Sequence, residues 1–150
     1  MALVTGASRG IGEACAVELA RRGARVVICS RKPDPLEAAA ERVRRRTGAE
    51  VVAVAAHAGR EEELEALAEE VMARWGRLDI LVNNAGTNPH LGPTLEIEPA
   101  AWDKTFEVNL RGPLLLTRLA YRAWMRDHGG AVVNVASIAG INPALGLGAY

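Results

Sequence analysis

The sequence is poor in several residue types, and each shortage excludes a class of protein. Its two cysteines, Cys15 and Cys29, are isolated, which excludes a disulfide framework and a cysteine-rich zinc site. Three Trp, two Tyr and one Phe are too few for base-stacking platforms that bind nucleic acids. Neither sign of charge is in excess, because 18 Lys and Arg balance 18 Asp and Glu, so no broad field would attract nucleic acid or an anionic membrane.

Long apolar runs are also absent from the start of the chain. The first apolar stretch, from Met1 to Val4, is far too short for a signal peptide or a membrane span. Together with two thiols that we expect to be buried and reduced, this predicts a soluble, cytoplasmic protein. The length of 150 residues fits one domain, and no linker, low-complexity segment or charge run divides it.

Predicted strands and helices alternate along the chain. Short apolar runs rich in β-branched residues predict strands at 2–5, 25–29, 51–55, 79–82 and 131–135. Apolar residues at helical spacing predict helices at 11–22, 36–46, 61–75 and 99–127, the last with an irregularity at Gly112-Pro113. This alternation specifies an α/β fold, a doubly wound parallel sheet with right-handed crossovers and helices on both faces.

The first strand is followed directly by a glycine turn, Thr5-Gly-Ala-Ser-Arg-Gly-Ile-Gly12. Glycine allows positive φ and lets a phosphate approach the backbone, and the helix that follows offers free N–H groups and its positive dipole end. Gly6, Gly10 and Gly12 therefore favour dinucleotide binding over a plain tight turn. Their spacing is Gly-x3-Gly-x-Gly rather than the general Gly-x-Gly-x2-Gly fingerprint.

Five landmarks in register resemble the classical short-chain dehydrogenases/reductases: the glycine turn, Asn83-Asn-Ala-Gly86 after the fourth strand, Asn109 in a helix, Ser137 after the fifth strand, and Tyr150, 13 residues later. The resemblance implies a Rossmann-type sheet of strand order 3-2-1-4-5. It also implies three catalytic residues. Tyr150 would be the acid/base, Ser137 would hydrogen-bond the substrate oxygen, and Asn109 would hold a proton relay through an ordered water.

The end of the second predicted strand decides between NAD and NADP, because an acidic residue there would repel a 2′-phosphate. That position holds Ser30, followed by Arg31 and Lys32, and Ser8 and Arg9 of the glycine turn can face the same pocket. Hydroxyl and guanidinium groups suit a phosphate dianion, so we predict NADP(H). The alternative is that Arg31 and Lys32 are solvated loop charges.

Other cofactor contacts follow from the resemblance. After the third strand the family commonly has an Asp that touches adenine, and the matching position here is His57, followed by Ala58. His57 would either bond the base or be a loop histidine without a ligand, and Asn83 and Asn84 would either contact the cofactor or tie loops to the sheet. The predicted cofactor-binding residues are Gly6, Ser8, Arg9, Gly10, Ile11, Gly12, Ser30, Arg31, His57, Ala58, Asn83 and Asn84.

The implied reaction is NADP(H)-dependent interconversion of a ketone and a secondary alcohol, as in 3-oxoacyl reductases or general carbonyl reductases. Ile141, Pro143, Leu145 and Leu147 predict an apolar substrate wall. The alternative is a non-catalytic NADP(H)-binding sensor or truncated pseudo-enzyme. A P-loop phosphotransferase is excluded because no Gly-Lys-Ser/Thr follows the glycine turn.

The family's catalytic lysine lies four residues after the tyrosine, beyond Tyr150. We therefore interpret the chain as a fragment truncated at the catalytic tyrosine, and we expect it to be inactive or nearly so as it stands. The family also pairs its fourth helix between subunits, which implies a homodimer or homotetramer for a full-length protein. The apolar residues of that helix are Leu114, Leu115, Leu116, Leu119 and Ala120.

Overall fold

The computed structural model describes residues 1–142, 145–148 and 150. Its five strands are β1 (Ala2–Thr5), β2 (Val26–Ser30), β3 (Val51–Ala55), β4 (Ile80–Asn83) and β5 (Ala131–Asn134). They form one sheet in the order β3-β2-β1-β4-β5, and every neighbouring pair is parallel. The predicted fold class and strand order are confirmed.

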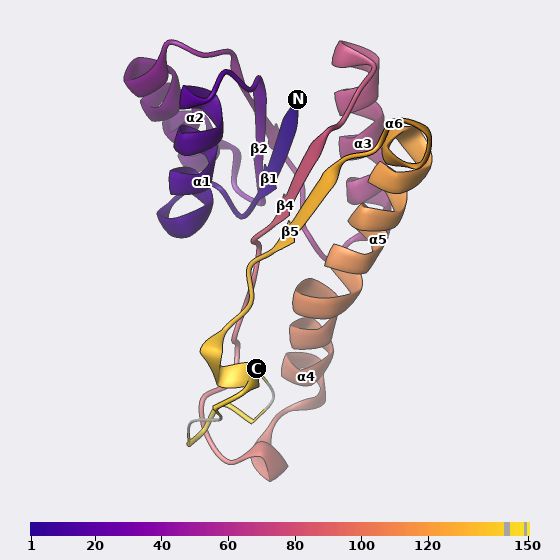
Figure 1. The fold of residues 1–150 in the computed structure, drawn as a ribbon. Helices are drawn as coiled ribbons and strands as arrows, with labels where there is room; N and C mark the ends of the chain where they lie inside the picture. The colour runs from indigo at the N-terminus through magenta and orange to yellow at the C-terminus, as the bar shows by residue number, and fades with distance from the viewer. Residues whose placement is uncertain (143–144, 149) are drawn as a thin grey trace.

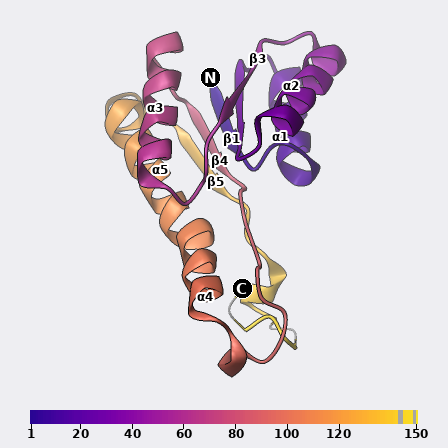
Figure 2. The same cartoon turned by 180° about the vertical axis from the view of Figure 1, so that it is seen from behind.

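Helices cover both faces of this sheet (Figures 1 and 2). One face carries α1 (Gly10–Arg21) and α2 (Pro33–Thr47), and the other carries α3 (Glu61–Trp75) and α5 (Gly112–Ala120). The α5 helix belongs to a long helical segment, in which it is preceded by α4 (Pro99–Phe106) and η2 (Glu107–Arg111) and followed by η3 (Tyr121–Met125) and α6 (Arg126–His128). None of the helices in the described ranges is long and apolar enough to cross a membrane.

The central strands are buried on both faces, which is why they are apolar without alternation. In β1, Ala2 and Val4 pack with α1 and α2, whereas Leu3 packs with α3 and α5. In β2, Val26 and Ile28 pack in the same core, with α1 and α2. Val27 packs in the core on the other face, with α3 and α5. Two cores therefore fix the register of the strands that carry the glycine turn.

Two helix predictions need correction. The second helix begins at Pro33 rather than at residue 36, because proline is favoured in the first helical turn, where no N–H partner is needed. The irregularity predicted at Gly112-Pro113 lies one turn earlier, as the π-helical turn η2. Pro113 has no N–H for the carbonyl of Asn109, four residues back, and the π-helical turn that ends just before Gly112 accommodates the missing bond.

The segments after β4 and β5 extend beyond the carboxyl ends of the strands, on the same side of the molecule as α4 (Figure 1). They run side by side, since the N–H of Gly92 donates to the carbonyl of Gly146 at 3.1 Å. Each carries a short 3₁₀ turn, η1 (Thr94–Glu96) or η4 (Ile138–Gly140). All four residues of β5, the edge strand, are exposed.

Candidate functional site

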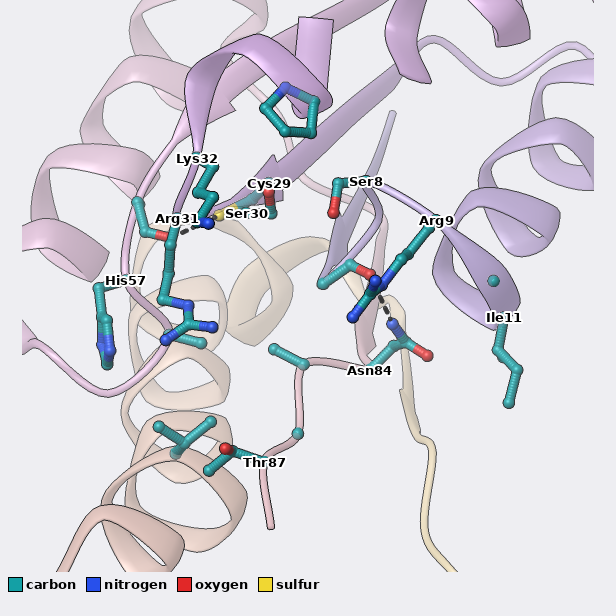
Figure 3. Close-up of a pocket in the computed structure, with 18 residues that line it drawn as sticks. Ser8, Arg9, Ile11, Cys29, Ser30, Arg31, Lys32, His57, Asn84 and Thr87 are labelled. Carbon is teal, nitrogen blue, oxygen red and sulfur yellow. Dashed lines mark hydrogen bonds between the residues drawn. The ribbon is translucent and has the colours of Figure 1, made fainter. Parts of the chain in front are cut away.

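A cleft of about 580 Å³ opens at the carboxyl ends of the strands. It lies where the strand order reverses at β1, between β2 and β4, the position at which open α/β sheets bind ligands. Its walls come from the glycine turn, the end of β2, and the segments after β3 and β4 (Figure 3). The lining includes ten of the twelve predicted cofactor residues: Gly6, Ser8, Arg9, Gly10, Ile11, Ser30, Arg31, His57, Ala58 and Asn84.

The glycine turn is packed closely against the segment after β4. A Cβ on Gly12 would lie 2.5 Å from Asn84 Nδ2 and 2.7 Å from the carbonyl oxygen of Gly6. Asn84 Nδ2 also donates to the carbonyl oxygens of Thr5 and Gly6, at 2.8 and 3.2 Å. Gly12 thus stands outside the lining of the cleft, and its missing side chain leaves room for Asn84 to close the turn.

Asn83 also stands outside the lining and is buried at the end of β4. Its Nδ2 donates to Thr117 Oγ1 at 3.1 Å and to Asn134 Oδ1 at 2.9 Å. These bonds join β4 to α5 and β5. The structure therefore places Asn83 as a tie between elements, whereas Asn84 both ties the glycine turn and lines the cleft.

One end of the cleft is rich in cations and hydroxyl groups. Ser30, Arg31 and Lys32 line it at the end of β2, and Ser8 and Arg9 line it from the glycine turn (Figure 3). Among the described residues that line the cleft there is no aspartate or glutamate. The cleft can therefore hold a multiply charged anion such as a phosphate.

His57 lines the cleft directly after β3 and is buried by neighbours that the sequence did not indicate. Its Nδ1 accepts a hydrogen bond from the N–H of Gly59 at 3.1 Å, and its Nε2 lies 2.7 Å from Lys104 Nζ. Burial lowers the pKa of His57, and the positive charges of Lys104, Arg60 and Arg31 lower it further, against the opposing effect of Glu107. The imidazole is therefore neutral near pH 7.

The three predicted catalytic residues lie at the same end of the sheet. Each of them is hydrogen-bonded to the backbone of another residue rather than to one of the other two. Both groups of the Asn109 amide are bonded at 2.8 Å to the backbone of Thr87. Ser137 Oγ accepts from the N–H of Ala139 at 3.1 Å, and the N–H of Tyr150 donates to Leu147 at 3.0 Å. In the described ranges, no hydrogen bond joins two of the three.

The predicted cofactor residues leave out several residues that lie in the cleft or contact its lining. Thr87 directly follows Asn-Asn-Ala-Gly86, so its position was a usable signal. Cys29 lines the cleft at the end of β2, where burial raises the pKa of its thiol to about 12 and makes it unreactive. Lys104 contacts His57 across 47 residues of chain, and no local pattern signals that contact.

A parallel sheet of this order, with a glycine turn that opens onto a cleft at its carboxyl edge, defines a dinucleotide-binding fold. The chain matches the short chain dehydrogenase family over residues 1–150 and belongs to that family. It is 41% identical to the human protein named "Dehydrogenase/reductase SDR family member 2, mitochondrial", over all of this chain and 53% of that protein. Members of that family are oxidoreductases.

Solved structures agree with this assignment. A metagenomic short-chain oxidoreductase in complex with NADP is 40% identical, with a TM-score of 0.92 over 99% of this chain and 67% of that one. An NAD⁺-bound xylitol dehydrogenase is 28% identical, with a TM-score of 0.93 over 99% of this chain and 57% of that one. The chain spans about half the length of the curated relatives it matches.

Proposed function

We propose that the chain forms the cofactor-binding part of an NADP(H)-dependent oxidoreductase that interconverts a ketone and a secondary alcohol. The observation that carries the cofactor assignment is the cationic end of the cleft. Arg31 and Arg9 can form paired N–H bonds to phosphate oxygens, and Ser30 adds a hydroxyl donor. An NADP(H) 2′-phosphate is the group that these donors suit.

Family membership alone does not choose between the two cofactors. Structural relatives include an NADP complex and an NAD⁺ complex, both with TM-scores above 0.9. NAD specificity calls for a carboxylate that bonds the ribose hydroxyls, and the described lining of this cleft holds none. The residues after β2 are therefore the argument for NADP(H).

The reaction needs a hydride, a proton and a positioned carbonyl oxygen, and the cofactor supplies the hydride. We assign Tyr150 as the group that gives the proton to the oxygen or removes it in the reverse direction, and Ser137 as a hydrogen-bond donor to the same oxygen. Because both sides of its amide bond the backbone of Thr87, Asn109 would hold the segment after β4 against the long helix.

Apolar side chains near the reaction centre support an apolar carbonyl or alcohol as substrate. Ile138, Ile141 and Leu145 are exposed in the segment between Ser137 and Tyr150. Pro143, which the sequence also assigned to this wall, lies outside the described residues. We propose that these side chains pack against the substrate.

The cytoplasmic location remains a sequence prediction, and the human relative carries a mitochondrial name.

The long helix divides its apolar residues between the core and an exposed face. Leu115, Leu116 and Ala120 are buried against the sheet, whereas Leu114 is 66% exposed. With Trp102, Phe106, Leu110 and Tyr121, Leu114 forms an exposed stripe. We propose that a second copy of the protein covers this stripe, and a monomer in sedimentation velocity at micromolar concentration would contradict that.

The cofactor assignment is tested by Arg31→Asp, in protein expressed from its complete reading frame. We expect NADPH to bind about 10- to 100-fold more weakly, because a charge-assisted bond is replaced by repulsion, and NADH to bind no more weakly. The matched control is Arg25→Asp, an equal charge change at the opposite end of β2. Unchanged NADPH binding in Arg31→Asp would refute the 2′-phosphate site.

The wild-type protein, expressed from its complete reading frame, also distinguishes an oxidoreductase from a non-catalytic cofactor sensor. NADPH oxidation that depends on an added ketone, followed at 340 nm, is the expected result for an oxidoreductase. Tight NADPH binding with no oxidation across a panel of apolar ketones and 3-oxoacyl thioesters would instead favour the sensor.

A further inference from the structure

We infer that Arg42, which lies outside the cleft, is a positioning residue that holds the glycine turn in the conformation that selects NADP(H). Arg42 is on α2, 34 residues after Ser8 of the turn. The inference rests on the proposed function, because it concerns the preference for the 2′-phosphate. It assigns that preference partly to a side chain that does not touch the cofactor.

The contacts of Arg42 connect three separate parts of the cofactor side. Its Nε and Nη2 donate to the two carboxylate oxygens of Glu13, at 2.9 and 2.7 Å. Its Nη2 also donates to the carbonyl oxygen of Ser8, at 3.2 Å. One guanidinium thus links α2 to the first turn of α1 and to the middle of the glycine turn.

The Ser8 carbonyl matters because of the geometry of the peptide bond. In a trans peptide the C=O of Ser8 and the N–H of Arg9 point in opposite directions. While Arg42 holds the carbonyl toward α2, the N–H of Arg9 points to the other side of the turn. The side chains of Ser8 and Arg9, which flank this peptide, both line the cationic end of the cleft.

Without that contact the Ser8 carbonyl would lose the hydrogen bond that holds it toward α2. Gly10, which has a positive φ, directly follows Arg9 and restrains the chain little on that side. On the other side Ala7 is buried, and its N–H donates to the carbonyl of Cys29 at 3.1 Å. Loss of the contact would let the backbone of Ser8 and Arg9 shift, and the Ser8 hydroxyl and the Arg9 guanidinium would then move relative to Arg31. These groups would then no longer point toward one 2′-phosphate.

Glu13 keeps the guanidinium in place. The carboxylate is 14% exposed, and its hydrogen bonds from Arg42 lower its pKa, so the pair is fully charged near neutral pH. The two parallel N–H bonds fix the plane of the guanidinium as well as its position. Arg42 also neutralises a carboxylate that lies in the first turn of α1, where a cofactor phosphate would bind the helix N-terminus.

The same helix contains a matched control. Arg44 Nε donates to the carbonyl oxygen of Val51 at 2.8 Å, and its Nη1 bonds Glu37 and Glu41 at 2.8 and 3.3 Å. Arg44 thus also joins a backbone carbonyl to carboxylates. Neither Arg44 nor Val51 lines the cleft.

The test compares Arg42→Gln with Arg44→Gln in protein expressed from its complete reading frame, with Kd values for NADPH and for NADH. We expect Arg42→Gln to weaken NADPH binding about tenfold and NADH binding clearly less, so the preference ratio falls. Arg44→Gln should keep the ratio of the wild type even where it lowers Tm. Equal ratios in the two variants would overturn the inference.

A double variant separates position from charge. Arg42→Gln alone leaves the carboxylate of Glu13 without its partner charge, and adding Glu13→Gln removes that carboxylate. The double variant still lacks the bond from Arg42 to the Ser8 carbonyl, so NADPH binding should stay weak. Recovery to the wild-type Kd would overturn the positional role. If the wild type itself does not prefer NADPH, the proposed function fails and this inference with it. If the wild type prefers NADPH and Arg42→Gln keeps that preference, only the inference fails.

Discussion

Two regions meet at the carboxyl end of the sheet, and they are held in different ways. The cofactor side, made of the turns after β1, β2 and β3, is fixed by bonds that span the chain, such as Asn84 to Thr5 and Arg42 to Ser8. The proposed reacting side, made of the described residues that follow β5, holds Ser137 and Tyr150 by bonds to residues two or three positions away. Tyr150 is 45% exposed.

The difference follows from the strands that carry each region. β1 is buried along its whole length, and β2 is buried except at its last residue, Ser30, so both arrive at the cleft with a fixed register. β5 is exposed along its whole length, and the chain that follows it pairs with the segment after β4 at Gly92 and Gly146. Cofactor binding and turnover should therefore be separable by mutation.

The largest expected effect is a loss of turnover without a loss of cofactor binding. Tyr150→Phe removes the proposed acid/base, so we expect kcat to fall by about 10²- to 10⁴-fold, the range for loss of general acid–base catalysis. NADPH affinity should stay unchanged, because Tyr150 does not line the cleft. The measurements are ketone-dependent NADPH oxidation and NADPH binding by fluorescence. Tyr121→Phe, at another exposed tyrosine, is the control.

Two results would contradict the comparison. A kcat within a few-fold of the wild type would remove Tyr150 from the reaction. A matching loss of NADPH affinity would mean that the reacting side also builds the cofactor site.

The second prediction compares the packing of the two regions through one substitution. Gly12→Ala places a Cβ against Asn84, Gly6 and Ala7, so we expect the free energy of unfolding to fall by about 1–3 kcal/mol. Gly140→Ala, in η4, meets no atom within 4 Å and should change stability by less than about 0.5 kcal/mol. Urea unfolding measures both. Equal losses would show that the two regions are equally packed.

The sequence predicted the parts of this arrangement that depend on local pattern. Runs of β-branched residues located the strands, and ten of the predicted cofactor residues line the cleft because they follow strand ends, where parallel strands bring their loops together. Arg42 bonds Glu13, His57 contacts Lys104 and Asn83 bonds Asn134, and these partners lie 29, 47 and 51 residues away in sequence. Such contacts depend on how whole helices pack, and neither periodicity nor motif spacing encodes that.

The smallest expected effect is a pH dependence on the cofactor side. His57 has a lowered pKa in the folded protein, so between that value and about 6.5 the unfolded chain binds more protons than the folded one. The free energy of unfolding should therefore fall as pH drops below about 6.5, by at most about 1.4 kcal/mol per pH unit from this residue.

The matched variant for this prediction is His57→Gln, which keeps a polar side chain and cannot take up the proton. Urea unfolding at pH 7.5 and 5.5 should show a smaller loss of stability in His57→Gln than in the wild type. Lys104→Gln should lie between them, because burial, the larger cause of the lowered pKa, remains when the neighbouring charge is removed. Identical pH dependence in all three proteins would mean that His57 is hydrated in solution, and that the cofactor side is less tightly closed around β3 than around β1.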